Sequence, residues 1–285
     1  MISFRLKSNL KLISFLLISL SSFFCKTGLT EDNIFKPKER IIALTSLSAD
    51  LVNSISNESL IAIPGTSLFK NRNEFKDKII ISQGRTPPDL EKIISLKPTL
   101  VIGSKGFHDI TLKKLNEFGI TTISAEIKKF SDLEDLSKSI SKYTNTDDFS
   151  LKNKIPNCYN LDLDKKESTL VMVSSKPILS PNSKSWSGNL LRRFNINNLS
   201  SDLESKSSFR GYANISSEWL VSKNPKNIIV ISTPGSDISQ YRKLPYWNKL
   251  NAVKNDNIYE FEYYGFINPG SAEAINNACI KLKAI

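Results

Sequence analysis

The chain has 285 residues, 40% of them hydrophobic and 24% charged, with a formal net charge of +11. This length accommodates two domains, and the composition is typical of a globular protein. The positive charge could suit nucleic acid or an anionic membrane. However, the lysines are scattered and no nucleic-acid-binding motif is visible, so we expect a solvated basic surface and no nucleic-acid partner.

Residues 1–25 have the pattern of an export signal, with three basic residues followed by an apolar run over 12–24. As a helix, this run would span roughly 20 Å, short of the ~30 Å hydrocarbon core, which favours a secretory signal over a transmembrane helix. Cys25 stands where a bacterial lipoprotein carries its lipid, although Phe24 precedes it where Gly, Ala or Ser is usual. Lipidation of Cys25 and an uncleaved signal are two ways of holding the exported protein at the membrane.

Residues 36–130 alternate strand and helix patterns, which predicts a first lobe with a largely parallel sheet. The expected strands are 41–46, 60–63, 79–81, 100–102 and 121–125, and the expected helices lie near 49–55, 89–97 and 112–118. Ligands bind at the carboxyl ends of strands in such sheets. Those ends are 46–48, 83–85 and 103–108, which makes Arg85 and His108 candidate ligand contacts.

Residues 131–168 form the expected connector between two lobes. Residues 131–143 have apolar side chains at helical spacing. A second, weaker helical pattern covers 147–163, but Pro156 interrupts it, because proline cannot continue a helix. The polar stretch 165–167 marks the boundary of the second lobe.

Residues 169–285 form the expected second lobe, with strands at 169–175, 228–231 and 257–262 and helices at 189–194 and 271–283. Loops at 176–186, 208–214 and 263–269 would bring aromatic residues and an arginine to one sheet edge: Trp186, Phe209, Arg210, Tyr212, Tyr263, Tyr264 and Phe266. Each is by itself an ordinary packing residue. Together they suit a large, flat or conjugated ligand, so the candidate contacts here are Trp186, Arg210, Tyr212, Tyr264 and Phe266.

One helix, proline and strand pattern occurs in both halves, at 89–104 and 216–232, and argues for two lobes of similar build. Each copy contains a helix-capping residue, a Glu and, seven positions after the Glu, a Pro that ends the helix before a buried strand. These residues are Asp89, Glu91 and Pro98 in the first copy and Ser216, Glu218 and Pro225 in the second.

The numbers of cysteines and histidines limit which disulfides and metal sites the chain can form. Three cysteines are too few for a disulfide framework, and the spacing of Cys158 and Cys279 leaves open whether they pair or stay free. The only histidine is His108, so a His-rich metal site is not expected. No phosphate-binding loop, dinucleotide fingerprint or nucleophile elbow is present, and we predict a protein that is not an enzyme and has no resident cofactor or metal.

Four stretches in order, 40–55, 88–104, 211–232 and 247–261, resemble class III periplasmic substrate-binding proteins of ABC importers, the cobalamin and iron–siderophore group. The resemblance implies an α/β fold of two Rossmann-like lobes with mainly parallel sheets, joined by a long helix, with ligand held in the cleft between them. It also implies that Glu91 and Glu218 dock into arginine pockets of the membrane permease. The alternative is that each Glu only favours the dipole of its helix.

In some relatives of this group a disulfide joins the last helix to a Cys after the first helix of the second lobe. Cys279 matches the former, but LLRRFNINN at 190–198 has no Cys, so that disulfide is not expected.

These observations predict an exported, monomeric solute-binding protein that delivers a bulky ligand to an ABC permease. A permease-independent scavenger and an enzyme on the same fold are the alternatives. Arg85 and Arg210 favour a carboxylate- or phenolate-rich siderophore, whereas the tyrosines and Trp186 equally suit cobalamin or haem.

Overall fold

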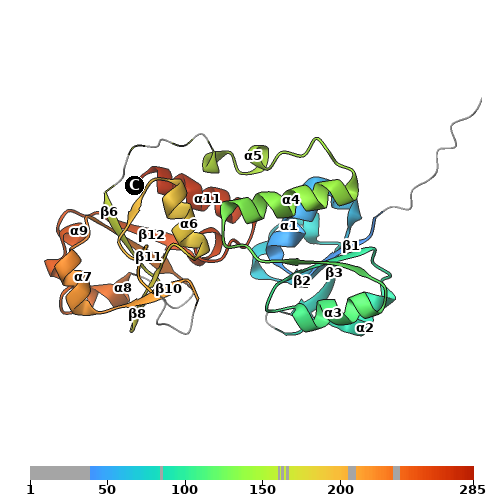
Figure 1. Ribbon diagram of the computed structural model, residues 1–285, viewed down its shortest axis with the longest axis horizontal. Helices are drawn as coiled ribbons and strands as arrows, with labels where there is room; N and C mark the ends of the chain where they lie inside the picture. Colours follow the sequence, from blue (N-terminus) through green and yellow to red (C-terminus); the bar gives the residue numbers. More distant parts are fainter. Residues whose placement is uncertain are drawn as a thin grey trace, which may run out of the picture. The chain divides into compact units, whose positions relative to one another are not determined.

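The computed structural model describes residues 39–83, 86–159, 161, 164, 167–204, 210–233 and 238–285. The expected export signal at 1–25, Cys25, Arg85 and Phe209 lie outside the described residues. Residues Lys38–Ile285 form one compact unit. Within this unit the expected α/β fold of two Rossmann-like lobes is confirmed (Figure 1).

The first lobe contains a parallel sheet in the order β3-β2-β1-β4-β5. Its strands are β1 Ile41–Ala43, β2 Leu60–Gly65, β3 Ile79–Gln83, β4 Leu100–Ser104 and β5 Thr121–Ala125. The central strand β1 is buried throughout, as expected for a sheet covered on both faces. The strand order reverses between β1 and β4, which is where ligands enter sheets of this type.

Helices cover both faces of this sheet. α1 (Ser46–Ser56) and α4 (Phe130–Thr144) share one core cluster, whereas α2 (Leu90–Ser95) and α3 (Asp109–Glu117) share another. The 3-10 turns η1 (Asn57–Ser59), η2 (Ser67–Phe69) and η3 (Asn73–Phe75) lie between strands. The expected strand 41–46 is shorter than predicted, because the side chain of Thr45 caps α1 and starts the helix at Ser46.

The second lobe contains a parallel sheet in the order β12-β11-β6-β9 and an antiparallel sheet in the order β10-β8-β7. The strands are β6 Ser168–Met172, β7 Ser174–Ser175, β8 Ile178–Pro181, β9 Asn197–Asn198, β10 Tyr212–Ile215, β11 Asn227–Ser232 and β12 Ile258–Glu262. The loops expected at 176–186 and 208–214 therefore supply β8 and β10. These two strands pair with each other across more than thirty residues of sequence, as in Tyr212 with Pro181, a partnership that local patterns do not reveal.

The described helices of the second lobe are α6 Trp186–Arg193, α7 Ser217–Lys223, α8 Ser239–Arg242, η5 Trp247–Lys249, α9 Asn251–Lys254, α10 Tyr263–Phe266 and α11 Ala272–Lys283. α6 begins three residues before the expected start, because the Ser185 hydroxyl caps it by accepting the N–H of Gly188. The expected caps of the repeated pattern are confirmed. Asp89 accepts from the N–H of Lys92 at α2, and Ser216 accepts from the N–H of Trp219 at α7.

The helix expected over 131–143 is present as α4 (Phe130–Thr144). α4 packs against α1, and between α4 and β6 the described residues form only the single turn α5 (Leu151–Lys154) and the 3-10 turn η4 (Pro156–Cys158). Pro156 interrupts the weak helical pattern over 147–163 as expected, because proline lacks the N–H that a continuing helix needs. α5 ends at Lys154, and η4 begins at Pro156. A disulfide joins Cys158 to Cys279 and ties η4 to α11, which decides the alternative left open by the sequence.

Two hydrogen bonds between buried groups join the lobes. The N–H of Phe130, at the first turn of α4, donates to Asn189 Oδ1 on α6 at 2.9 Å. The N–H of Ala272, at the first turn of α11, donates to Asp50 Oδ2 on α1 at 2.7 Å. Both bonds satisfy first-turn N–H groups that have no partner within their own helix.

No helix in the described ranges is long and apolar enough to cross a membrane.

Candidate ligand-binding site

A cleft of about 760 Å³ is lined by residues of both lobes. On the first lobe its lining comes from the carboxyl ends of four strands: residues 44–47, 64–67, 103–104, 107–108, 125 and 127–128, with Leu136 of α4 behind them. Two of the expected strand ends, 46–48 and 103–108, thus contribute to the lining. Gln83, from the third, lies in a separate surface hollow.

His108 is the first candidate residue that the cleft contains. It precedes α3, its side chain is only 5% exposed, and its Nδ1 accepts the backbone N–H of Ser104 at 3.0 Å. An accepting Nδ1 carries no proton, so the neutral ring holds its proton on Nε2. Burial lowers the pKa of His108, and the nearby Asp109 carboxylate opposes this effect only in part. His108 is therefore a neutral donor at the wall of the cleft.

Trp186 forms part of the opposite wall. It was expected in an exposed loop, but it is the first residue of α6 and is only 4% exposed. Its indole N–H donates to the carbonyl oxygen of Gly265 at 2.9 Å, and the neighbouring Ser187 hydroxyl donates to the carbonyl of Phe266 at 2.7 Å. The α6 terminus thereby holds the turn that presents Tyr263 and Tyr264 to the cleft.

Phe266 was expected to contact ligand, and this prediction is wrong. Its side chain is 0% exposed and packs in the core with its ring centroid 4.7 Å from that of Phe261. The chain turns between Tyr264 and Phe266 at Gly265, which has φ +89°, a conformation that glycine adopts readily. A Cβ there would lie 2.0 Å from the carbonyl oxygen of Ala274. Because of this turn, Tyr264 faces the cleft and Phe266 faces the interior.

Tyr212 and Arg210 also line the cleft. Tyr212 begins β10, and burial raises the pKa of its phenol, with a hydrogen bond to Ser187 acting in the opposite sense. Arg210 is exposed at the rim. Of the seven predicted contacts, five therefore share this cleft, Phe266 does not, and Arg85 lies outside the described residues.

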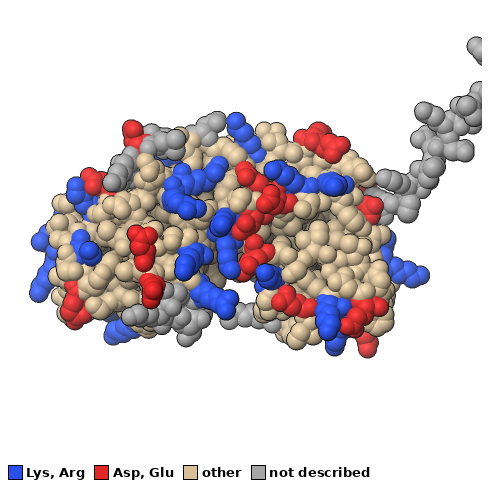
Figure 2. All heavy atoms as spheres, in the orientation of Figure 1, with Lys and Arg blue, Asp and Glu red and all other residues tan. Residues whose placement is uncertain are grey.

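The described lining of the cleft contains cations but no carboxylate. Lys128 comes from the segment after β5, Lys184 from the segment after β8, and Arg210 from the segment just before β10. Lys128 forms an ion pair with Glu126, which is not itself part of the lining. Figure 2 shows basic side chains on both sides of the hollow in the lower middle of this face, with acidic side chains among them on the right.

Sequence reasoning missed Lys128, Lys184 and the exposed Phe107. Only their position in the sequence could have indicated that they line the cleft, since each follows a strand whose carboxyl end meets it.

Glu91 and Glu218 lie outside the cleft lining, each as the second residue of its helix and exposed. Hydrogen bonds from its own backbone N–H and from the hydroxyls of Ser216 and Ser217 lower the pKa of Glu218. In the described chain, no three His, Cys, Asp or Glu side chains gather in a way that could hold a metal ion.

This chain has two Rossmann-like lobes with an aromatic and basic cleft between them, the arrangement of a two-lobed solute-binding protein. The family model of the periplasmic binding proteins matches residues 41–263, so the chain belongs to that family.

Curated relatives support the same assignment. A vitamin B12-binding protein of Vibrio vulnificus is 23% identical over 79% of this chain and 82% of its own length. An uncharacterised ABC transporter substrate-binding lipoprotein of Bacillus subtilis is 20% identical over 80% of this chain and 74% of its own length.

Solved structures share the fold. A possible iron-binding, periplasmic solute-binding protein of Staphylococcus epidermidis superposes with a TM-score of 0.66 at 22% identity, covering 87% of this chain and 97% of that one. A periplasmic haem-binding protein of Vibrio cholerae gives a TM-score of 0.66 at 17% identity, covering 86% of this chain and 98% of that one.

Proposed function

We propose that this chain is an exported solute-binding protein that captures a bulky, anionic ligand and delivers it to an ABC permease. The observation that carries the proposal is the cleft of about 760 Å³, whose described lining combines tyrosines and Trp186 with three cations and no carboxylate. Its volume falls within the range of about 300–1,000 Å³ typical of small-molecule sites. Aromatic walls suit a flat or conjugated body, and the cations suit carboxylates or phenolates on it.

The ligand class follows from the charges. Relatives of this chain are named for vitamin B12, haem and iron. A ferric siderophore with carboxylate or catecholate groups, or haem with its two propionates, matches Lys184 and Arg210 better than cobalamin does, because a net negative charge gains from both cations. The ligand is cargo, and the proposal includes no resident cofactor and no catalytic step. His108 would donate its Nε2–H to an acceptor on the cargo.

Delivery would use Glu91 and Glu218. Each carboxylate stands exposed at the start of a capped helix, one on each lobe, and the lowered pKa of Glu218 keeps that group charged. Two separated carboxylates on one body can pair with two sets of guanidinium groups on a permease, which gives oriented, charge-assisted docking. Residues 1–25 would direct export, with Cys25 or an uncleaved signal holding the protein at the membrane. One chain supplies both cleft walls, so a monomer suffices.

The test is a titration of the protein with haemin, a ferric tris-catecholate and cyanocobalamin, followed by tryptophan fluorescence. We expect saturable quenching by haemin or the ferric catecholate, and affinity about 10-fold weaker or more in the double variant Lys184→Ala with Arg210→Ala. The matched control removes two exposed cations outside the cleft lining, Lys138→Ala with Arg192→Ala, and should bind as the unaltered protein does.

Three results would overturn parts of this proposal. No response to any probe in a folded sample would reject capture of this ligand class. Tight binding of cyanocobalamin alone, unchanged in the double variant, would reject the anionic ligand. Ligand uptake by cells that proceeds without a permease would favour a scavenging protein instead.

A further inference from the structure

Arg193 lies behind the cleft wall, among aromatic rings rather than beside a carboxylate. Its Cζ lies 3.8 Å from the ring centroid of Phe130 and 5.1 Å from that of Tyr159. The ion pairs of the described chain do not include Arg193, and its Nε donates to the carbonyl oxygen of Cys158 at 2.9 Å. A cation over the faces of aromatic rings attracts them, and this cation is itself oriented by one backbone carbonyl.

Phe130 connects Arg193 to the cleft. Its ring lies nearly parallel to the indole of Trp186, with an interplanar angle of 11° and centroids 6.4 Å apart. The N–H of Phe130 is also bound to Asn189 Oδ1, so the start of α4 is fixed against α6. Trp186 lines the cleft, whereas Phe130 and Arg193 do not. Arg193 therefore contacts Phe130, the ring that packs against the cleft-lining Trp186.

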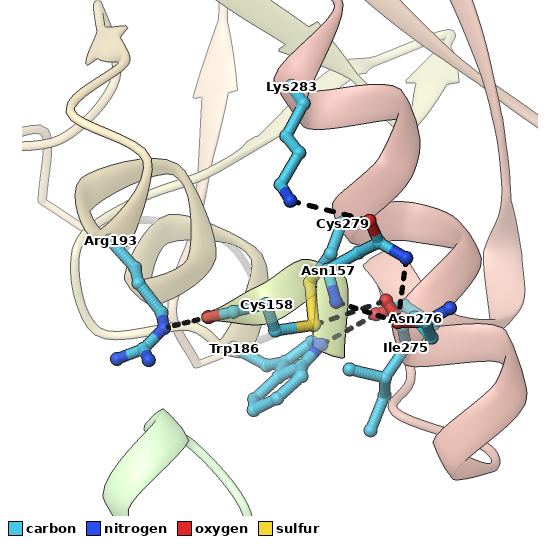
Figure 3. Close-up of a disulfide and its surroundings, with 9 residues drawn as sticks. Asn157, Cys158, Trp186, Arg193, Ile275, Asn276, Cys279 and Lys283 are labelled. Atoms are coloured by element: carbon cyan, nitrogen blue, oxygen red, sulfur yellow. Dashed lines mark hydrogen bonds between the residues drawn. A yellow bond between two sulfur atoms is a disulfide. The ribbon is translucent and has the colours of Figure 1, made fainter. Parts of the chain in front are cut away.

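The disulfide anchors the other end of this arrangement. Cys158 and Cys279 are both fully buried, and their bond holds η4 against α11 (Figure 3). Asn157 reinforces this contact, because its N–H donates to Asn276 Oδ1 at 3.1 Å while its own Oδ1 accepts from Lys283 Nζ at 3.3 Å. The carbonyl that orients Arg193 is thus fixed by a covalent crosslink and two side-chain contacts.

Tyr159 closes the cluster on the side of the first lobe. Its hydroxyl donates to Glu134 Oε1 on α4 at 2.9 Å, and its ring meets that of Phe130 edge to face at 5.4 Å. The cluster therefore joins α4 of the first lobe, the crossover segment and α6 of the second lobe at one point.

We propose that Arg193 is a positioning residue for the ligand cleft. It transmits the fixed position of the disulfide-bound segment, through Phe130, to the Trp186 wall. The inference rests on the proposed function only in taking the cleft as the ligand site. Loss of the Arg193 contacts leaves the Trp186 indole less confined at its back and changes the shape of the cleft without removing any group that touches ligand.

The test observes Trp186 directly. The sequence has three tryptophans, so Trp219→Phe with Trp247→Phe leaves Trp186 as the only one. In this background, Arg193→Gln should shift the Trp186 emission to longer wavelength, raise its quenching by acrylamide about 2-fold, and weaken haemin binding about 5-fold. Arg193→Lys, which keeps a cation near Phe130, should restore part of each signal. Cys158→Ser with Cys279→Ser should shift the emission in the same direction as Arg193→Gln.

Two controls separate positioning from general stability. Arg192→Gln removes an exposed cation one residue away, and Val253→Ala weakens the separate core cluster of the second lobe. Neither should alter Trp186 emission. If Arg193→Gln lowers the melting temperature as Val253→Ala does but leaves Trp186 emission and quenching unchanged, the proposal is wrong. The emission readout needs no ligand, so it decides the role of Arg193 even if haemin does not bind the unaltered protein.

Discussion

The carboxylate of Asp50 accepts a hydrogen bond of 2.7 Å from the backbone N–H of Ala272, a residue 222 positions further along the chain. Asp50 belongs to α1 of the first lobe and is completely buried, whereas Ala272 begins the last helix of the second lobe. The other carboxylate oxygen lies 2.6 Å from Arg72 Nη2, which also contacts Glu74. A single buried charge thus serves the positive end of α11 and an arginine on its own lobe.

Asp50→Ala should destabilise the protein strongly, because it leaves Arg72 and the N–H of Ala272 without this partner. We expect the free energy of unfolding to fall by about 3–5 kcal/mol, the usual cost of breaking a buried ion pair from one side. Asp50→Asn keeps an acceptor for Ala272 and should cost less. Urea unfolding followed by circular dichroism measures both. Equal losses in the two variants would show that the hydrogen bond to α11 contributes little.

Removal of the disulfide should also destabilise the protein. The bond between Cys158 and Cys279 closes a loop with a sequence separation of 121 residues. A crosslink over so long a loop restricts the unfolded chain strongly, and its loss typically costs about 2–5 kcal/mol. Cys158→Ser with Cys279→Ser should therefore unfold at lower urea concentration and become insensitive to reductant, whereas the unaltered protein should move towards the same midpoint when reduced. A reductant-insensitive unaltered protein would argue against the crosslink.

Gly265→Ala should weaken ligand binding and stability more than Gly119→Ala, a substitution at a glycine of similar backbone conformation. Gly265 and Gly119 have φ values of +89° and +77°, so alanine is strained at both. Only at Gly265 would a Cβ meet backbone, 2.0 Å from the oxygen of Ala274, whereas nothing lies within 4 Å at Gly119. We expect Gly119→Ala to cost about 1 kcal/mol and leave haemin binding intact. Gly265→Ala should lose more stability and bind haemin at least about 10-fold more weakly, because the turn that presents Tyr264 must shift.

Folding stability should depend on the protonation of His108. Burial lowers its pKa in the folded protein below the ordinary value of about 6.5. The neutral ring therefore contributes stability that is fully present above about pH 6.5 and is lost as the pH falls from there through the folded pKa, with a slope of at most about 1.4 kcal/mol per pH unit. His108→Asn keeps an acceptor for the N–H of Ser104 but does not titrate. The difference in unfolding free energy between the two proteins should be independent of pH above about pH 7 and should begin to change as the pH falls below about 6.5. Parallel pH profiles would contradict this prediction.

Glu91→Gln with Glu218→Gln should separate capture from delivery. Neither carboxylate lines the cleft, so the affinity for haemin or the ferric catecholate should not change. Docking to the permease should weaken, and ligand uptake by cells should fall about 10-fold or more, because two charge-assisted contacts are lost. Glu117→Gln, at the exposed end of α3, is the matched control, and cells that carry this variant should take up ligand normally. Normal uptake by the double variant would assign Glu91 and Glu218 to helix stability alone.

Local chemistry explains what was predictable here. Asp89 and Ser216 cap helices because a short oxygen-bearing side chain reaches first-turn N–H groups from its own position in the chain. The prolines that follow end those helices whatever the rest of the fold does. Continuous apolar strands bounded by such signals predicted the parallel sheet of the first lobe, and the carboxyl ends of those strands predicted where the cleft opens.

Contacts between distant segments decided which side chains face the cleft and which strands and cysteines pair. Tyr264 and Phe266 are both aromatic and only two residues apart, and what sends one to the cleft and the other to the core is the packing of Gly265 against Ala274. The pairing of β8 with β10 and the choice of Cys158 as the partner of Cys279 likewise depend on which segments meet in space.

The sequence by itself therefore determined the class of fold, the two capped helices that carry Glu91 and Glu218, and the edge of each sheet where ligand would bind, because these depend on chemistry within a few residues. Only the tertiary structure decided which side chains reach the cleft and how Asp50 and the disulfide join distant segments. Those outcomes depend on the burial and hydrogen bonding of groups that approach each other only in the folded chain.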